Sequence, residues 1–227
     1  ALNNRGYVRL NQKAYPAAIE DLAQAVKLNP KFVSARVNLG LAYFRENRFL
    51  KAAEEFSEAI KQEPMHARHY AHRREAWQKA GEFERARKDE EHLLWLGQLE
   101  HHNLQIAKKP HDADRFVERA RHWLSIDNLS MAMQDFNAAL KVDPECVEAY
   151  LGRGQLYFSQ NRYREAIEEC TQALRHESSQ SVYSLRGDAR FHLGDYPGAI
   201  RDFVLARRID SVVAQAYLKH SEQLSQA

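Results

Sequence analysis

Histidines are the residues of this chain whose type and spacing bear most directly on chemistry. Seven of the eleven histidines fall between positions 66 and 111: His66, His69, His72, His92, His101, His102 and His111. His69 and His72 stand three residues apart, which places both imidazoles on one face of a helix, and such a pair binds a metal ion when further ligands converge on it. Incidental surface histidines are more common than ligating ones. We therefore expect no metal site here.

Other catalytic motifs are missing from the sequence. There is no phosphate-binding G-x-x-x-x-G-K-S/T loop, no dinucleotide glycine fingerprint, no H-E-x-x-H and no G-x-S-x-G. The only cysteines, Cys146 and Cys170, are too few for a disulfide scaffold, and Cys170 is expected in the core. We expect a non-enzymatic protein without cofactors, and we favour a reducing compartment such as the cytoplasm.

The charge and the hydropathy of the chain exclude two classes of partner. The chain has 227 residues, of which 33 are Lys or Arg and 31 are Asp or Glu, so its formal net charge is only +2. A dedicated nucleic-acid binder usually carries a clear basic excess, so nucleic acid is not the expected partner. No apolar run of about 18 residues spans a bilayer, and the N-terminus has no signal-peptide core, so no membrane partner is expected. The first residue is Ala, which is compatible with a processed or trimmed piece of a longer protein.

The chain repeats itself. Residues 15–30, 49–64, 129–144 and 163–178 are copies of one segment, 196–211 is a fifth copy, and 83–94 is a weaker one. An alanine marks each copy, at Ala18, Ala52, Ala86, Ala132, Ala166 and Ala199, so the intervals are 34, 34, 46, 34 and 33 residues. The long interval contains a 12-residue insertion between Ala86 and Pro110.

Each repeat is predicted to be two amphipathic helices. Apolar residues recur at steps of three and four in the copies and in the stretches before them, for example 35–49 and 149–163. Asn or Gly occupies the short turns inside four of the repeats, where a left-handed backbone ends a helix: Asn47, Gly81, Asn161 and Gly194. Proline ends the second helix of most repeats.

This period and residue pattern resemble the tetratricopeptide repeat family. Residues 33–66 match its signature with Leu39, Gly40, Tyr43, Ala52, Phe56, Ala59 and Pro64, and residues 147–179 match it with Tyr150, Gly154, Tyr157, Ala166, Ala173 and, less well, Cys170. The resemblance implies an all-α fold, a right-handed superhelical solenoid of antiparallel helix pairs. We expect a single domain, 1–227, with repeats at 1–32, 33–66, 67–112, 113–146, 147–179 and 180–212 and a capping helix at 213–226.

The third repeat departs from the family pattern. Arg74 replaces a small residue, Glu90 an aromatic residue and Leu93 an alanine, so looser packing is expected. The insertion is predicted to prolong the second helix by about three turns, with a loop or short helix near residues 101–103 as the alternative. Apolar residues of 93–109 either pack internally or form a self-association surface: Leu93, Leu94, Trp95, Leu96, Leu99, Leu104 and Ile106.

The resemblance also implies a concave groove, lined mainly by first helices, that receives a peptide or a helix of a partner. The predicted partner-binding residues are Tyr7, Val37, Asn38, Leu41, Phe44, Arg68, His72, Arg121, Leu124, Phe158 and Phe191. Packing against neighbouring helices is the alternative for the apolar ones. One subset of the family clamps a carboxylate, and its pattern is matched well only by Asn38 and Arg68. An acidic segment is favoured by four residues: Arg68, His72, Lys79 and Arg121.

Arginine and acidic residues recur at two fixed positions of the repeat. The seventh position is arginine in five copies, Arg5, Arg73, Arg119, Arg153 and Arg186, and the twenty-third is acidic in all six, Asp21, Glu55, Asp89, Asp135, Glu169 and Asp202. We predict ion pairs between the two helices of a repeat. The function expected is a protein-interaction scaffold, and the alternative is a substrate-recruiting or regulatory domain of a larger enzyme, chaperone or co-chaperone.

Overall fold

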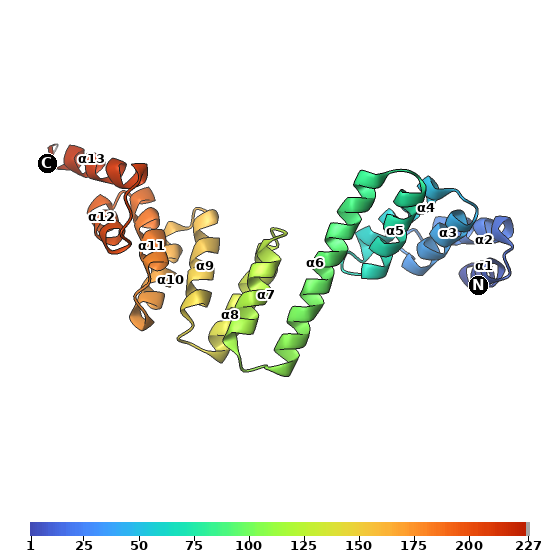
Figure 1. Cartoon of the computed structure of the whole chain (residues 1–227), viewed down its shortest axis with the longest axis horizontal. Coiled ribbons are helices and arrows are strands. Elements are labelled where there is room, and N and C mark those ends of the chain that lie inside the picture. The colour runs from blue at the N-terminus through green and yellow to red at the C-terminus, as the bar shows by residue number, and fades with distance from the viewer. Residues whose placement is uncertain (226–227) are drawn as a thin grey trace. The chain divides into compact units, whose positions relative to one another are not determined.

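A computed structural model describes residues 1–225, and within that range every regular element is a helix (Figure 1). The elements are α1 (Leu2–Asn11), α2 (Tyr15–Leu28), α3 (Val33–Arg45), α4 (Phe49–Gln62), α5 (Ala67–Lys79), α6 (Phe83–Lys108), α7 (Ala113–Leu124), α8 (Leu129–Val142), α9 (Val147–Ser159), α10 (Tyr163–His176), α11 (Gln180–His192), α12 (Tyr196–Leu205) and α13 (Ser211–Ser225). The all-α prediction is confirmed. None of the described helices has the length and apolar character needed to cross a membrane.

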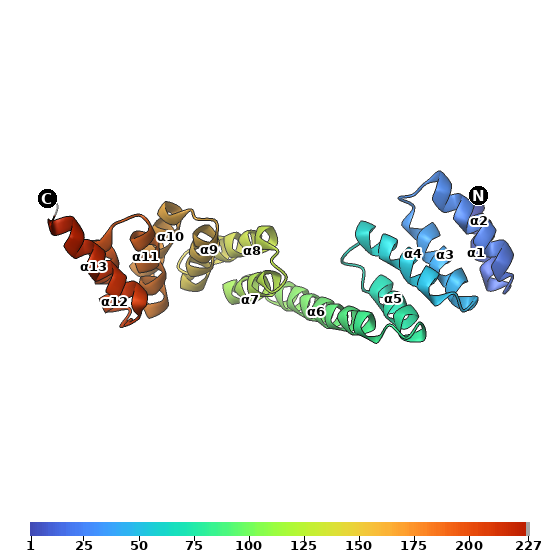
Figure 2. The ribbon, with the colours of Figure 1, turned by 90° about the horizontal axis from the view of Figure 1, so that it is seen from above.

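The chain divides into two compact units, and the division falls within α6. The first unit is Ala1–Glu100, and the second begins at His101. Inside each unit, helices that follow one another in sequence lie side by side as antiparallel pairs (Figures 1 and 2). A single continuous solenoid over the whole chain stays a prediction.

The turns inside the repeats have the backbone that the sequence predicts. Asn47 and Asn161 have φ of 58° and 59°, and Gly81 and Gly194 have φ of 79° and 80°. Asparagine and glycine adopt this left-handed conformation at low cost, and it ends the first helix of each pair. Short turns of this kind keep the two helices antiparallel and in contact.

The insertion prolongs a helix, as predicted. α6 has 26 residues, whereas α2, α4, α8 and α10 have 14 each. The added length is about three turns at 3.6 residues per turn. Residues 101–103 are helical, so the alternative of a loop or separate short helix there is wrong.

Small residues allow the paired helices to approach closely. A Cβ atom added at Gly40 would lie 2.7 Å from Cε1 of Phe56, which is fully buried. In the third repeat the same two positions hold Arg74 and Glu90, which form an ion pair instead. An ion pair in the third repeat therefore replaces the contact that a small residue and an aromatic ring make in the second repeat.

Arginines and acidic residues pair within five repeats, as predicted. Each arginine donates from Nε, at 2.8–3.0 Å, and from Nη2, at 2.5–2.8 Å, to a carboxylate 16 residues later. The pairs are Arg5–Asp21, Arg73–Asp89, Arg119–Asp135, Arg153–Glu169 and Arg186–Asp202, and we call them the arginine ladder. A guanidinium that donates two parallel bonds fixes the crossing of the two helices it joins.

Four ladder arginines also reach back to the second helix of the preceding repeat. Their Nη1 atoms donate to Ser57 (3.0 Å), Asn103 (2.8 Å), Asn137 (2.8 Å) and Thr171 (3.3 Å). Asn103 lies in the prolonged part of α6, whereas Asp89 in its first part pairs with Arg73 of α5. The first part of α6 thus completes the pair with α5, and its last turns provide the helix against which α7 stacks.

Glu55 is the exception in the ladder, because Leu39 stands where its arginine would be. Arg36, one turn earlier on α3, donates to Glu55 at 3.0 Å instead. Burial raises the pKa of Glu55, and Arg36 opposes that shift.

The last described helix, α13, covers the C-terminal repeat through Val213 and Ala216. Tyr217 on the same helix is half exposed. Residue 226 of the predicted capping helix lies outside the described residues.

Candidate functional site

One face of the first unit, made of α1, α3 and α5, carries most of the predicted partner-binding residues. They recur at steps of four and three residues, as Val37, Leu41 and Phe44 do on α3, so each helix presents them on one side. Asn38 Nδ2 donates to Asn3 Oδ1 at 3.0 Å and joins α3 to α1 on this face. We call this face the α1–α3–α5 surface.

Three hollows lie on the α1–α3–α5 surface. The first, of about 460 Å³, is lined by Tyr7, Leu10, Asn11, Lys13, Tyr15, Leu41 and Arg45. The second, of about 410 Å³, is lined by Val33, Ser34, Val37, Asn38, Glu63, His66, Arg68 and His69. The third, of about 100 Å³, is lined by Leu41, Phe44, Arg45, Phe56, His72 and Glu75. All seven predicted residues of the first unit line one of these hollows.

Cations without acidic partners surround the hollows. Lys13, Arg45 and Arg68 are exposed and, among residues 1–225, pair with no carboxylate, in contrast to the arginines of the ladder. An exposed guanidinium beside apolar side chains favours a segment that offers a carboxylate and a bulky apolar group together.

The apolar residues that α3 contributes to this surface are partly covered by neighbouring side chains. Val37, Leu41 and Phe44 are half-buried and pack against the core formed around Phe56. Tyr7 is the large apolar residue with most free surface, being half exposed. The alternative of partial packing therefore holds for the α3 residues, which form the floor of the hollows rather than projecting anchors.

His72 is held by packing. Its ring stacks on Phe56 at 5.3 Å between centroids. Burial lowers the pKa of His72 most strongly, while Glu75 raises it and Arg68 lowers it further. The imidazole is therefore neutral near pH 7 and serves as a flat, partly apolar wall of the third hollow.

Two predicted residues of the second unit, Phe158 and Phe191, both contact the ring of His192. Phe158 makes edge contacts with Tyr163 (5.3 Å) and His192 (5.5 Å), and Phe191 packs against the core of α12 and α13. Arg121 is exposed and Leu124 half-buried. A hollow on this unit is lined by other residues of α9, α11 and the segment after α12.

Some residues of the surface were missed from the sequence. Arg45 lines two hollows and follows Phe44 directly, at a repeat position that generally faces the groove, so its position was a usable signal. Lys13 and Tyr15 were missed because they belong to the turn and the start of the second helix, whereas only first helices were expected to line the groove.

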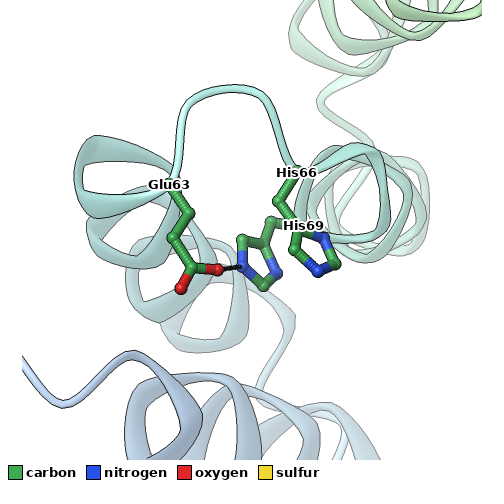
Figure 3. Close-up of side chains that lie close together, drawn as sticks. All are labelled: Glu63, His66 and His69. Carbon is green, nitrogen blue, oxygen red and sulfur yellow. Dashed lines mark hydrogen bonds and ion pairs between the residues drawn. The ribbon is translucent and has the colours of Figure 1, made fainter. Parts of the chain in front are cut away.

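A histidine pair forms, but it is not the pair the sequence indicated. His72 points to Phe56, whereas His69 lies beside His66 and Glu63 at the turn between α4 and α5 (Figure 3). His69 Nε2 and Glu63 Oε2 are 2.9 Å apart. These three residues are spaced across a turn, so the helical spacing of His69 and His72 does not indicate them.

Most apolar residues of the insertion are covered. Trp95, Leu96 and Leu99 are buried and Leu93 and Ile106 are half-buried, whereas Leu94 and Leu104 are exposed. Internal packing accounts for the larger part of the set. Self-association through 93–109 stays a prediction that rests on two exposed leucines.

Comparison with known proteins agrees with the helix pairs. The profile of the tetratricopeptide repeat family matches residues 3–67 and 128–182, a little over half of the chain. The chain belongs to the tetratricopeptide repeat family. Proteins of this family are scaffolds for interactions between proteins, and that general role is the one the fold supports.

Similar tetratricopeptide repeat proteins are much longer than this chain. It is 29% identical over 94 residues to tetratricopeptide repeat protein 34 of Xenopus laevis, which covers 40% of this chain and 17% of that protein. It is 30% identical over 104 residues to the DnaJ protein P58IPK homolog B of Oryza sativa subsp. japonica, covering 42% of this chain and 22% of that protein. Among solved structures, the TPR2AB domain of yeast Sti1 in a pHSP90 complex aligns with a TM-score of 0.41 at 16% identity, over 98% of this chain and 93% of that one.

Proposed function

We propose that this tetratricopeptide repeat protein binds an acidic segment of a partner protein, extended or helical, on the α1–α3–α5 surface. The observation that carries the proposal is the set of three hollows, two of which share Leu41 and Arg45, and which together include every predicted residue of the first unit. Concave surfaces with an apolar floor and a few charged groups are the usual form of a binding site.

The floor and the rim have different parts in binding. Tyr7, Leu41 and Phe44 supply apolar area, which contributes about 25 cal/mol for each Å² that a partner covers. Lys13, Arg45 and Arg68 supply positive charge on the rim, which speeds the encounter with an acidic segment and sets its direction. Because the ladder arginines are already paired, the rim cations are the ones available to a partner.

The second unit is proposed to contribute a further stretch of contacts through Arg121, Leu124, Phe158 and Phe191. Their support is the position of these residues in the repeat, since the described structure places them outside the hollow of that unit. The 93–109 region is proposed as a second surface for self-association.

A second candidate is a recruiting or regulatory domain of a larger chaperone or co-chaperone. The observation that favours it is the similarity to a DnaJ protein, of which this chain spans only 22%. Such a domain would bind unfolded segments of many sequences, which are rich in apolar residues and carry no common charge.

The test is a selection of peptides from a random twelve-residue display library against the whole chain. We expect the enriched peptides to combine Asp or Glu with a bulky apolar residue, and we expect their binding to weaken as salt is raised. Enrichment of apolar peptides without acidic residues would favour the chaperone alternative. A selection that enriches no peptide, or basic ones, would contradict the proposal.

A further inference from the structure

We propose that Glu63, His66 and His69 form a binding site for a divalent transition-metal ion, with Zn²⁺ as the expected occupant. This proposal departs from the expectation, drawn from the sequence, that the histidines hold no metal. It stands independently of the partner-binding proposal, because it concerns an ion and needs no partner.

The three side chains converge although they come from different elements (Figure 3). Glu63 is the residue that directly follows α4, and His66 is the residue that directly precedes α5. His69 lies in the first turn of α5. One ligand atom from each residue lies within 4.8 Å of the ligand atoms of the other two.

The turn backbone holds this spacing. His66 N–H donates to the Glu63 carbonyl oxygen at 3.2 Å, and His69 N–H donates to the His66 carbonyl oxygen at 3.0 Å. The turn after α8 has the same two bonds, from Cys146 to Asp143 and from Ala149 to Cys146. The turn therefore forms without histidines, and its shape places side chains at these three positions close together.

His69 has a buried ring nitrogen that suits a metal ligand. Its side chain is buried, and Nδ1 has no hydrogen-bond partner among the described residues. Since an ionised carboxylate only accepts, Nε2–H donates to Glu63 and Nδ1 keeps a lone pair. A buried acceptor without a donor is unfavourable, and a metal ion that binds Nδ1 relieves that cost.

The geometry needs only a modest closure. Ligand atoms around a tetrahedral zinc ion at about 2.0–2.2 Å lie roughly 3.4 Å from one another. Glu63 is about half exposed and His66 is exposed, so both side chains are free to rotate toward the fixed His69. The rings of His66 and His69 are already side by side, with centroids 4.2 Å apart.

The chemistry of the donor set selects the class of ion. Two imidazole nitrogens and one carboxylate oxygen suit Zn²⁺, whereas Mg²⁺ and Ca²⁺ prefer oxygen ligands alone. Three protein ligands leave a fourth position open. The hollow shared with Val37, Asn38 and Arg68 adjoins the cluster, so an incoming ligand has access to that position.

The test is calorimetric titration of the untagged chain with Zn²⁺, together with the visible absorption of the Co²⁺-loaded chain. We expect one equivalent of Zn²⁺ to bind and Co²⁺ to show the intense bands of four-coordinate geometry. His66→Ala and Glu63→Gln, both at positions with free surface, are each expected to weaken Zn²⁺ binding at least tenfold and to abolish the Co²⁺ bands.

His111→Ala is the matched control, because His111 is exposed in the corresponding turn after α6 and belongs to the second unit. It is expected to leave the titration unchanged. Absence of Zn²⁺ binding, or equal binding by wild type, His66→Ala and Glu63→Gln, would overturn the proposal. A loss caused by His111→Ala instead would assign the ion to incidental surface histidines.

Discussion

Removal of one ladder arginine is expected to be far more damaging than removal of a surface arginine on the same helix. Arg119 donates two bonds to Asp135, whose side chain is only 4% exposed, and one to Asn103 of α6. Arg119→Met leaves the carboxylate of Asp135 buried without its partner. Breaking a buried pair in this way costs about 3–5 kcal/mol.

Partial exposure of Arg119 favours the lower end of that range. Its side chain is 22% exposed, so water solvates part of the guanidinium in the wild type. We therefore expect a loss of about 3 kcal/mol, which corresponds to an increase of about a hundredfold in the population of the opened state. Arg115→Met is the matched control, because Arg115 pairs with Asp112 and Glu118, whose side chains are 28% and 41% exposed, so that its loss leaves no buried charge and is expected to change stability little.

Hydrogen exchange of the α7 and α8 amides, read by mass spectrometry, is the suitable assay, since repeat proteins need not unfold in a single transition. The double variant Arg119→Met, Asp135→Leu is expected to recover most of the loss, because no charge then remains buried. If Arg119→Met accelerates exchange no more than Arg115→Met does, the ladder does not stabilise the helix pairs and the reasoning is wrong.

Three further predictions concern packing and titration. Gly40→Ala is expected to lower the thermal unfolding midpoint and to reduce the free energy of unfolding by about 1–3 kcal/mol, because the new Cβ would lie 2.7 Å from the buried ring of Phe56. An unchanged midpoint would show that the two helices can separate freely. Burial raises the pKa of the Cys170 thiol to about 12, so native protein at pH 8 is expected to alkylate at Cys170 only as fast as it unfolds, and rapid modification would contradict this. Burial also lowers the pKa of three histidines below the ordinary 6.5, namely His72, His92 and His102. As the pH falls, these histidines therefore take up protons in the unfolded chain before they do so in the folded protein. The free energy of unfolding is therefore expected to fall as the pH drops from 7.5 to 5.5, and urea midpoints that stay level or rise across this range would refute it.

The repeat period is what made the fold and the ladder predictable. Partners 16 residues apart, such as Arg153 and Glu169, recur with every repeat, so one helix-pair geometry places all of them. The prolonged α6 followed from the absence of proline in the insertion. By contrast, the sequence showed Arg74 and Glu90 only as two separate departures from the family pattern. The structure was needed to show that they form an ion pair with each other.

The repeat positions predicted which residues lie on the α1–α3–α5 surface, but they did not predict how exposed those residues are. Repeat position identifies the face on which Val37 and Phe44 lie, yet their burial depends on how tightly the next helix packs, which the sequence does not state. The Glu63, His66 and His69 cluster was missed because its spacing depends on a turn between repeats. Exposed residues of the surface, such as Tyr7 and Arg45, are consequently better probes of binding than the half-buried Phe44, whose loss would also affect stability.

The most direct test of the central claim is the dissociation constant of an acidic, apolar peptide from the display selection, measured by fluorescence anisotropy with wild type and three variants. Tyr7→Ala and Arg45→Glu alter exposed residues of the α1–α3–α5 surface, and Arg201→Glu reverses an exposed arginine of α12 as the control. We predict that each surface variant weakens binding by about tenfold, equivalent to about 1.4 kcal/mol, and that Arg201→Glu leaves it unchanged. Equal affinities for all four proteins, or a loss confined to Arg201→Glu, would contradict the placement of the binding site on the first unit.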